Sequence, residues 1–517
     1  MHPTRSTTAI TAFAAALAAL AGSAQAQINV IYTNVAGAPG NTIPGLASGW
    51  RPGATSQFDR PFRSSNNEFW VLGGFANEAT TSDRIVIRGS GPNRLAHTLI
   101  AREGTPAPFD LTYTYSFFET QLGINDTGTV AFINDMLSLT TADEVLVLSD
   151  GTTSTAPFRE GNAAPGFEAG VLLGANFESA GITNAGEVAA EVQLAGINIT
   201  TANDTALIVG TVSGSMILAR ESFAPTSGIG PLGTLQGFDD DQFSISADGQ
   251  SFLYLGDDNN ANPPGDNIVV YNGAVVLREA NAVTVGGPVI GTGGLRHGTL
   301  SMNGQHWLVR GIPATATPDL DWVVNNGQLV AVGLEDITPA NLSNESFNDA
   351  TFADLFFSIS INNNGDYVIG GTTDAPDILR NAVLVINGFR VIAREGDPVD
   401  LNEDGDFTND DAFIATFNND DAFLSDSLFY YFTADLRSAA GSTIGQAFLV
   451  LDAASTEPTC PDCAADYNQD GGVTGDDIAA FFVDFEAGSG CSDTNVDGGI
   501  TGDDIAAFFI AFEAGGC

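Results

Sequence analysis

The chain has 517 residues, of which 44% are hydrophobic, so it can bury two or three folded domains and is not a disordered chain. Its formal net charge is −46, and all 17 basic residues are arginine. Such an acidic surface repels nucleic acid, which excludes nucleic-acid binding, and it attracts divalent cations.

The first residues have the pattern of a secretory signal sequence. Arg5 supplies a positive charge, residues 9–21 form an apolar stretch of small side chains, and the Ala-Gln-Ala at 24–26 fits the small-x-small cleavage rule. We therefore expect a signal peptide over 1–26 and a protein that is secreted or held at the cell surface. No later stretch reaches 18 apolar residues, so no membrane-spanning helix is expected in the mature chain.

Residues 27–453 contain a polar turn and an alternating strand that recur with a period near 60 residues. Two weaker copies place Asn67 and Asp426 at the position that glycine takes in the others. Asn, Asp and Gly are the residues that best tolerate positive φ, so all seven copies are compatible with a turn that needs positive φ at this position. The turn glycines of the five stronger copies are Gly128, Gly186, Gly249, Gly304 and Gly365.

Each turn leads into a run in which apolar residues alternate, as at Val130 and Phe132, which is typical of a half-buried strand. A second and a third apolar run follow, so each repeat holds about four antiparallel strands. One such sheet cannot bury both faces, whereas a ring of sheets can, and we predict an all-β, seven-bladed β-propeller. The third run ends in Arg-Glu, at Arg102, Arg159, Arg220, Arg278 and Arg394.

The seventh repeat lacks its last strand, and the N-terminal segment 28–40 is similar to 154–166, with Thr33 and Asn34 in the Arg-Glu position. We expect this segment to complete the last blade, because an open ring leaves an unpaired edge. The repeated arginines are expected to tie each blade to an acidic residue of its neighbour, the alternative being a functional array around a pore. The repeat resembles the NxxGxxxF-type repeats of bacterial exported "choice-of-anchor" proteins, which implies an extracellular module.

After a linker at 454–459, two twelve-residue loops at 466–477 and 493–504 match the spacing of a calcium-binding loop. Calcium takes six to eight oxygen ligands, and oxygens at positions 1, 3, 5, 7, 9 and 12 surround one point. Position 12 is Asp rather than Glu, whose longer arm coordinates better. The expected Ca²⁺ ligands are Asp466, Asn468, Asp470, Gly472, Thr474 and Asp477 in one loop, and Asp493, Asn495, Asp497, Gly499, Thr501 and Asp504 in the other.

A third match to the calcium loop lies in the repeat region, at 400–411. It stands alone, and the alternative is an ordinary turn rich in Asp and Gly. Its candidate ligands are Asp400, Asn402, Asp404, Asp406, Thr408 and Asp411.

Each terminal loop runs into one helix with an apolar face, and no helix is expected before either loop. The four cysteines predict two disulfides of open pairing, with zinc as the rival: Cys460, Cys463, Cys491 and Cys517. This pattern over 460–517 resembles a GC-type dockerin, which implies a cohesin-like or cell-surface protein partner. The helix residues free to contact it are expected among Phe481, Phe482, Phe508 and Phe509.

Catalytic residues are not identifiable from the sequence. The mature histidines His97, His297 and His306 form no metalloprotease motif, and the nucleophile elbow, P-loop and dinucleotide motifs are missing. A carboxylate pair for glycoside cleavage stays open among 63 acidic residues. The sequence thus predicts a non-catalytic exported propeller, with a dockerin-bearing glycoside hydrolase or polysaccharide lyase as the alternative. Regular repeats favour the first, because enzymes on this fold usually carry long insertions; a carbohydrate ligand fits either.

Overall fold

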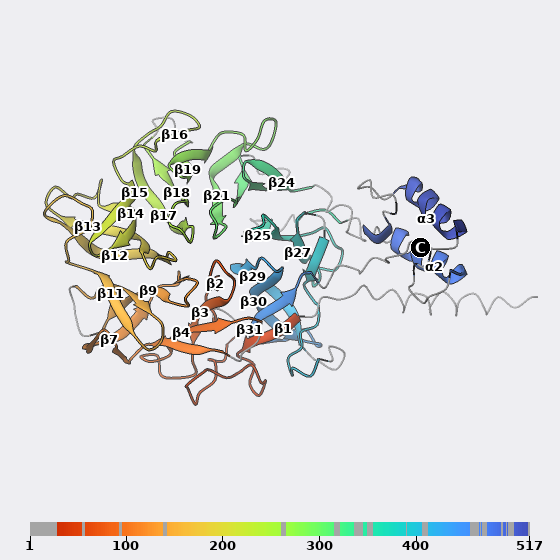
Figure 1. Cartoon of the computed structure of the whole chain (residues 1–517), viewed down its shortest axis with the longest axis horizontal. Coiled ribbons are helices and arrows are strands. Elements are labelled where there is room, and N and C mark those ends of the chain that lie inside the picture. Colours follow the sequence, from red (N-terminus) through yellow and green to blue (C-terminus); the bar gives the residue numbers. More distant parts are fainter. Residues whose placement is uncertain are drawn as a thin grey trace, which may run out of the picture.

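The computed structural model describes residues 28–53, 57–92, 96–137, 142–259, 265–314, 321–334, 345–348, 355–388, 390–405, 412–454, 465, 467, 473–486, 490–492, 494 and 501–514. Within this part of the chain, seven sheets stand in a ring around a central axis (Figure 1), so the predicted seven-bladed propeller is confirmed. The inner strands line a channel along this axis. The expected signal peptide over 1–26 lies outside the described residues.

In each blade the four main strands pair antiparallel and follow the chain order from the channel outwards, except that the N-terminal strand lies outermost in the last blade. The blades are as follows: blade 1, β2 (Phe62–Arg63), β3 (Phe69–Phe75), β4 (Arg84–Ser90) and β5 (Thr98–Arg102); blade 2, β7 (Asp110–Phe118), β9 (Val130–Met136), β10 (Glu144–Ser149) and β11 (Ser154–Arg159), with the short β6 (Pro106–Ala107) and β8 (Gly123–Ile124); blade 3, β12 (Val171–Ile182), β13 (Val188–Gly196), β14 (Thr205–Thr211) and β15 (Gly214–Arg220); blade 4, β17 (Leu235–Ile245), β18 (Phe252–Asp258), β19 (Asn267–Tyr271) and β20 (Ala274–Arg278), with the short β16 (Ser227–Gly228); blade 5, β21 (Ile290–Leu300), β22 (Trp307–Pro313), β23 (Trp322–Asn325) and β24 (Gln328–Val332); blade 6, β25 (Phe356–Ile361), β26 (Tyr367–Thr372), β27 (Ala382–Ile386) and β28 (Arg390–Arg394); blade 7, β29 (Ala412–Leu424), β30 (Phe429–Ser438), β31 (Thr443–Asp452) and β1 (Ile28–Thr33).

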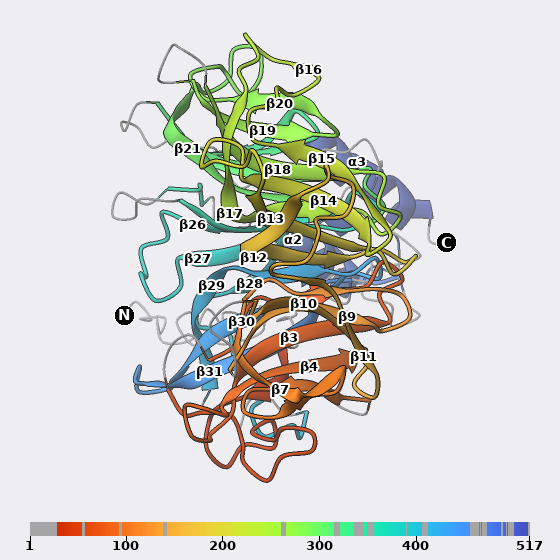
Figure 2. The ribbon, with the colours of Figure 1, turned by 90° about the vertical axis from the view of Figure 1, so that its left-hand side faces the viewer.

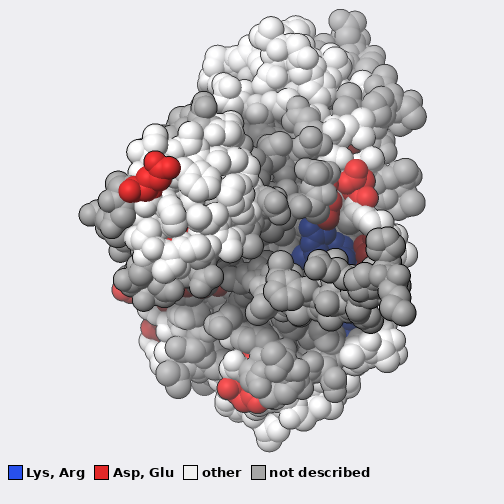
Figure 3. All heavy atoms as spheres, turned by 90° about the vertical axis from the view of Figure 1, so that its right-hand side faces the viewer, with Lys and Arg blue, Asp and Glu red and all other residues white. Residues whose placement is uncertain are grey.

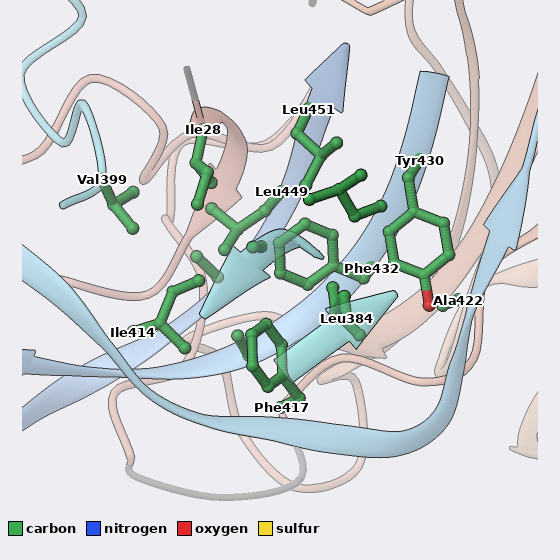
Figure 4. Close-up of a cluster of buried hydrophobic side chains, with 14 of the residues drawn as sticks. Ile28, Leu384, Val399, Ile414, Phe417, Ala422, Tyr430, Phe432, Leu449 and Leu451 are labelled. Carbon is green, nitrogen blue, oxygen red and sulfur yellow. The ribbon is translucent and has the colours of Figure 1, made fainter. Parts of the chain in front are cut away.

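The N-terminal strand closes the ring, as the sequence predicted. β1 pairs antiparallel with β31, and Ile28 lies against Leu449 and Leu451 (Figure 4). The Asn34 N–H donates to the Gln446 carbonyl (3.1 Å), and the Gln446 N–H donates to Asn34 Oδ1 (2.7 Å). Asn34 therefore takes the place that Glu103 takes in blade 1, where its N–H donates to the Arg84 carbonyl.

The hydrophobic core is divided among the interfaces between neighbouring blades, whose sheets pack face to face (Figure 2). One cluster joins Val71 of blade 1 to Phe132 of blade 2, and others join the remaining neighbours in the same way. Each fully buried aliphatic side chain contributes about 1.5–3 kcal/mol. Both faces of every sheet are thus covered, which a single four-stranded sheet could not achieve.

The polar turns join the first and second strands of the blades, and each has a residue with positive φ. Its N–H donates to the carbonyl three residues earlier, as from Gly128 to Asn125 (2.9 Å). In blade 7 the prediction that Asp426 takes this position is wrong. Leu428 has the positive φ, of 63°, and its N–H donates to the Ser425 carbonyl. Leucine is unfavourable in this conformation, so its residue type gave no sign of the turn.

These seven turns, here called the turn ring, hydrogen-bond to one another across one end of the channel. The Asp126 carboxylate accepts from Ser65 Oγ (2.7 Å) and from Asn184 Nδ2 (2.7 Å). Asn363 Nδ2 donates to Asp426 Oδ2 (2.8 Å) and also to the Ser65 carbonyl (3.1 Å), which joins blade 6 to blade 1. Because bonds also link non-adjacent blades, the turn ring narrows the channel at this end.

The repeated arginines are structural, but their partners differ from the predicted ones. Arg278 is buried and pairs with Asp258 of its own blade (Nη2–Oδ2 2.7 Å). Arg394 pairs with Glu345, which precedes β25 of the same blade (2.9 Å). The arginine therefore fastens its own blade, because the end of the outermost strand lies beside that blade's loops. Figure 3 shows arginine atoms gathered in a hollow with acidic atoms beside them.

Two helices, α2 (Gly475–Glu486) and α3 (Gly502–Ala514), follow the ring, with a short 3₁₀ turn at Gly490–Ser492. The rings of Phe481 and Phe508 are stacked with centroids 4.0 Å apart, and both side chains are buried. Of the four candidate residues, Phe481 and Phe508 are therefore needed in the small core that joins the helices, and a partner contact by Phe482 or Phe509 stays a prediction. None of the helices in the described ranges is long and apolar enough to cross a membrane.

Candidate functional site

A cavity of about 680 Å³ lies in the central channel, farther along the inner strands from the turn ring. Irregular pairing of these strands shapes it. β29 loses its register with β30 between Phe417 and Ala422, and β17 loses its register with β18 between Phe238 and Phe243. Such bulges turn extra side chains out of the sheet, and here they bring polar residues into the channel lining.

Asp420 is the most connected acidic residue of the cavity. Its Oδ2 lies 2.7 Å from Arg310 Nη2, and its Oδ1 accepts the Ile359 N–H (3.2 Å). Burial alone would raise the pKa of Asp420, but the charge of Arg310 and its hydrogen bond to the carboxylate hold this pKa below its ordinary value. Asp420 is therefore ionised at neutral pH.

His297 of β21 faces the same cavity and is 3% exposed. Its Nε2 is 3.9 Å from Asp420 Oδ1, and no hydrogen-bond partner for this nitrogen exists among the described residues. Burial lowers the pKa of His297 to about 3, against the attraction of Asp420. The imidazole is therefore neutral at physiological pH, with one ring nitrogen unsatisfied.

Asp421 differs from its neighbour Asp420. Burial raises the pKa of Asp421 to about 7, while Arg60 lowers it and Asp59 raises it. Asp59 itself pairs with Arg84 (3.2 Å). Two adjacent carboxyls with separated pKa values can serve as an acceptor and as a proton donor at the same pH.

A second group of acids, of which Glu144 and Glu191 are buried, lies in blades 2 and 3. The strand register places Glu178 opposite Glu191, and Asp135 opposite Glu144. Burial first, and then the neighbouring carboxylates, raise the pKa of Glu191 to about 8; burial raises that of Glu144 to about 9. Like charges directly opposite each other destabilise a sheet, so these glutamates are held as neutral acids. Within the described ranges, no group of three acidic, histidine or cysteine residues could hold a metal ion.

Most ligands of the two predicted terminal calcium loops lie outside the described residues, so those sites stay predictions. The residues at positions 9 and 12 are described. Asp477 Oδ2 accepts the Thr474 N–H (2.7 Å), and Asp504 Oδ2 accepts the Thr501 N–H (2.7 Å). Both aspartates are fully buried. Each therefore caps the start of its helix, as a residue of the first turn can do.

The third predicted loop is described only as far as Gly405. The Asp400 carboxylate accepts the N–H groups of Asp404 (3.2 Å) and Gly405 (3.1 Å), and the Asp400 N–H donates to the Ile28 carbonyl (3.2 Å). The loop thus begins beside the strand that closes the ring. Asp406, Thr408 and Asp411 lie outside the described residues.

The predicted disulfides also fall largely outside the described residues, which include Cys491 but not Cys460, Cys463 or Cys517. Cys491 is buried, and no cysteine of the described part is a free thiol. The pairing of the four cysteines stays open.

Sequence reasoning missed the channel cavity. In the sequence, His297 belongs to no motif, and Asp420 and Asp421 are two of 63 acidic residues. A signal was present nonetheless: in the fourth and seventh repeats a polar run, at 239–242 and at 418–421, interrupts the apolar alternation before the turn. Such an interruption within an inner strand is typical of a bulge.

Several solved structures are similar to this chain, all at low identity. Prolyl endopeptidases match with a TM-score of 0.38 and 12% identity, over 77% of this chain and 50% of theirs. The β-propeller domain of Myceliophteria thermophila Cps50 (Swd1) matches with a TM-score of 0.32 and 9% identity, over 78% of this chain and 98% of that domain. The β-propeller domain of the Trilobed protease from Pyrococcus furiosus matches with a TM-score of 0.33 and 10% identity, over 64% and 84%.

This chain spans about half the length of the prolyl endopeptidases it matches. At these TM-scores the matches add nothing to what the sheet topology shows. No curated protein matches the sequence. The model of a family of unknown function, DUF7453, matches residues 11–279, which is slightly more than half of the chain. The chain belongs to the DUF7453 family.

Proposed function

We propose that this chain is an exported, non-catalytic propeller that is held in an extracellular or cell-surface assembly by a calcium-dependent, dockerin-like module at 460–517. The observation that carries the proposal is the duplicated loop–helix unit, in which 466–477 and 493–504 repeat the spacing of calcium ligands. The partner would be a cohesin-like or cell-surface protein.

The described part of the module supports a fold that depends on metal. Its core is small, with Tyr467, Phe481, Cys491 and Phe508 as the buried members. A domain of this size gains little stability from apolar burial and usually needs disulfides or a metal. Each loop concentrates carboxylates whose repulsion opposes folding, and calcium would remove that repulsion and bind only the folded form. At 100 times the Kd, calcium would add about 2.7 kcal/mol of stability.

The surface of α3 supports a protein partner. Ile510 is 73% exposed, whereas Phe482 and Phe509 are only partly buried beside the core. An exposed large aliphatic residue on α3, together with two aromatic residues that the core covers only in part, offers apolar surface for a protein interface.

The test compares the full chain with the double variant Asp466→Ala/Asp493→Ala, by circular dichroism and by capture on a panel of immobilised cohesin domains. Calcium should increase helicity and allow capture for the wild type, and chelation or the double variant should abolish both. Glu513→Ala removes one exposed charge of α3 outside the loops and serves as the matched control. Identical helicity and capture under all conditions would reject the proposal.

A second candidate, a polysaccharide-degrading enzyme, is favoured by one observation. The channel cavity brings an ionised Asp420 and the higher-pKa Asp421 together with a neutral His297. The test is a glycan hydrolysis and lyase screen on the full chain, in which Asp421→Asn should abolish turnover. Turnover that persists in this variant would reject the assignment of the site.

A further inference from the structure

We propose that the channel cavity binds a neutral, polyhydroxylated ligand, namely the end of a saccharide chain. The inference concerns the ring alone and does not depend on the anchoring proposal. It rests on unsatisfied polar atoms, on the charge balance of the lining, on its aromatic side chains and on the narrowing of the channel by the turn ring.

The first observation is a set of polar atoms that are buried without partners. His297 is 3% exposed, and its Nε2 lacks a hydrogen-bond partner within the described structure. Gln121 Oε1 and Arg60 Nε, which line the same cavity, are also buried and without partners there. An unsatisfied buried polar atom is costly, and ligand hydroxyl groups can both donate to and accept from such atoms.

Two aspartates of the lining are paired with buried arginines that lie behind them. Asp59 pairs with Arg84 at 3.2 Å, and Asp420 pairs with Arg310 at 2.7 Å. Arg60 lines the cavity together with Asp241, Asp421 and Asp435, and burial raises the pKa of each of these aspartates, which favours their neutral form. An anion would therefore meet carboxyl groups, and a cation would meet the Arg60 guanidinium. A neutral ligand with many hydroxyl groups avoids both penalties and uses the excess of carboxylate and amide acceptors.

Aromatic side chains supply the apolar part of the lining. Phe58, Phe62 and Phe417 line the cavity. Phe417 is held by stacking on Phe357, with centroids 5.7 Å apart and planes at 8°. A fixed aromatic ring offers a flat surface to the C–H face of a sugar ring. The volume, about 680 Å³, lies within the range of small-molecule sites, about 300–1,000 Å³.

The turn ring decides that a chain end, rather than the middle of a chain, would enter. Asn184 Nδ2 donates to Ser65 Oγ (3.1 Å), and Asn363 Nδ2 donates to the Ser65 carbonyl (3.1 Å). Because these bonds link non-adjacent blades across the narrow end of the channel, a polymer cannot pass through it. A saccharide therefore enters and leaves on one side.

The test is isothermal titration of the full chain with neutral hexasaccharides, namely the cello-, xylo-, manno-, malto- and laminari- series, with spermidine as the cationic probe and citrate as the anionic probe. At least one neutral hexasaccharide should bind. His297→Ala and Asp421→Asn should each weaken this binding about tenfold, the effect of losing one hydrogen bond to a ligand. The matched control is His306→Ala, because His306 contacts Asn326 outside the cavity.

Thermal unfolding of each variant shows whether it is folded, and Asp421→Asn, which keeps the shape of the side chain, decides the test if His297→Ala is unfolded. Binding of spermidine or citrate without binding of any neutral hexasaccharide would overturn the proposal. So would an absence of binding by every probe, or equal affinity in the wild type and Asp421→Asn.

Discussion

Closure of the ring by the N-terminal strand can be tested by removing the side chains that hold this strand in place. Ile28 and Ile31 are both fully buried, and they belong to different interfaces. Ile28 packs in the cluster between blades 6 and 7, and Ile31 packs in the cluster between blades 7 and 1. The double variant Ile28→Ala/Ile31→Ala therefore weakens β1 on both faces of the sheet.

The expected cost follows from burial. Replacing a buried isoleucine by alanine costs about 2–5 kcal/mol, which combines lost transfer energy with the cavity left behind. The two residues contact separate clusters, so their effects should add, which gives about 4–10 kcal/mol for the double variant. A loss of this size is comparable with the whole stability of many domains, so the blade 7 interfaces should open at much lower denaturant.

The assay is urea unfolding of the full chain followed by tryptophan fluorescence. Trp50 and Trp70 lie in the same cluster as Ile31 and report on the closure directly. The matched control is Asn29→Ala, because Asn29 is exposed on the same strand and its loss should change stability by no more than about 0.5 kcal/mol. A double variant that unfolds at the same urea concentration as this control would show that β1 does not hold the ring.

Three further predictions follow from the sites. Calcium should release heat on titration into the full chain and raise the stability of the ring. Asp404→Ala should remove the part of both effects that comes from the loop at 400–411, beside β1. A titration curve that is the same for the wild type and this variant would contradict the site. Glu144 and Glu191 have pKa values of about 9 and about 8, above the ordinary 4.5, so between these values the folded state binds more protons than the unfolded state. The free energy of unfolding should therefore fall as pH rises from about 5 to about 8, on the order of 2 kcal/mol for each residue, since relaxation absorbs part of the shift. Replacing either glutamate by Gln should flatten this pH dependence, measured by urea unfolding at the two pH values. Phe508→Ala should remove the helical circular dichroism of the terminal module at a cost of about 3–5 kcal/mol, whereas Ile510→Ala should leave helicity unchanged and weaken only partner capture.

The repeat pattern was sufficient to predict the ring because each turn is a local feature. Five glycines and Asn67 mark positions where the backbone needs positive φ, and that demand depends only on neighbouring residues. Leu428 meets the same demand without a favourable residue type, because surrounding contacts hold it there. The sequence therefore located six turns correctly and misplaced the seventh by two residues.

The partners of the arginines were less predictable. The sequence showed that Arg278 and Arg394 recur at one place in the repeat, and it correctly indicated a structural role. It could not show whether the acid that pairs with each lies within the blade or across an interface. That choice depends on which loop folds over the end of the outermost strand, as Asp258 and Glu345 show.

The sequence by itself determined the class of fold and the closure by Ile28–Thr33, and it predicts the calcium loops from their spacing, because each of these rests on short-range periodicity or on a similarity between segments. Only the tertiary structure brought His297, Asp420 and Arg310 together, from blades 5 and 7. Their contact depends on how seven blades converge on one axis and on bulges in the inner strands. Convergence of distant segments leaves no local pattern, which is the physical reason that the channel cavity emerged only from the folded ring.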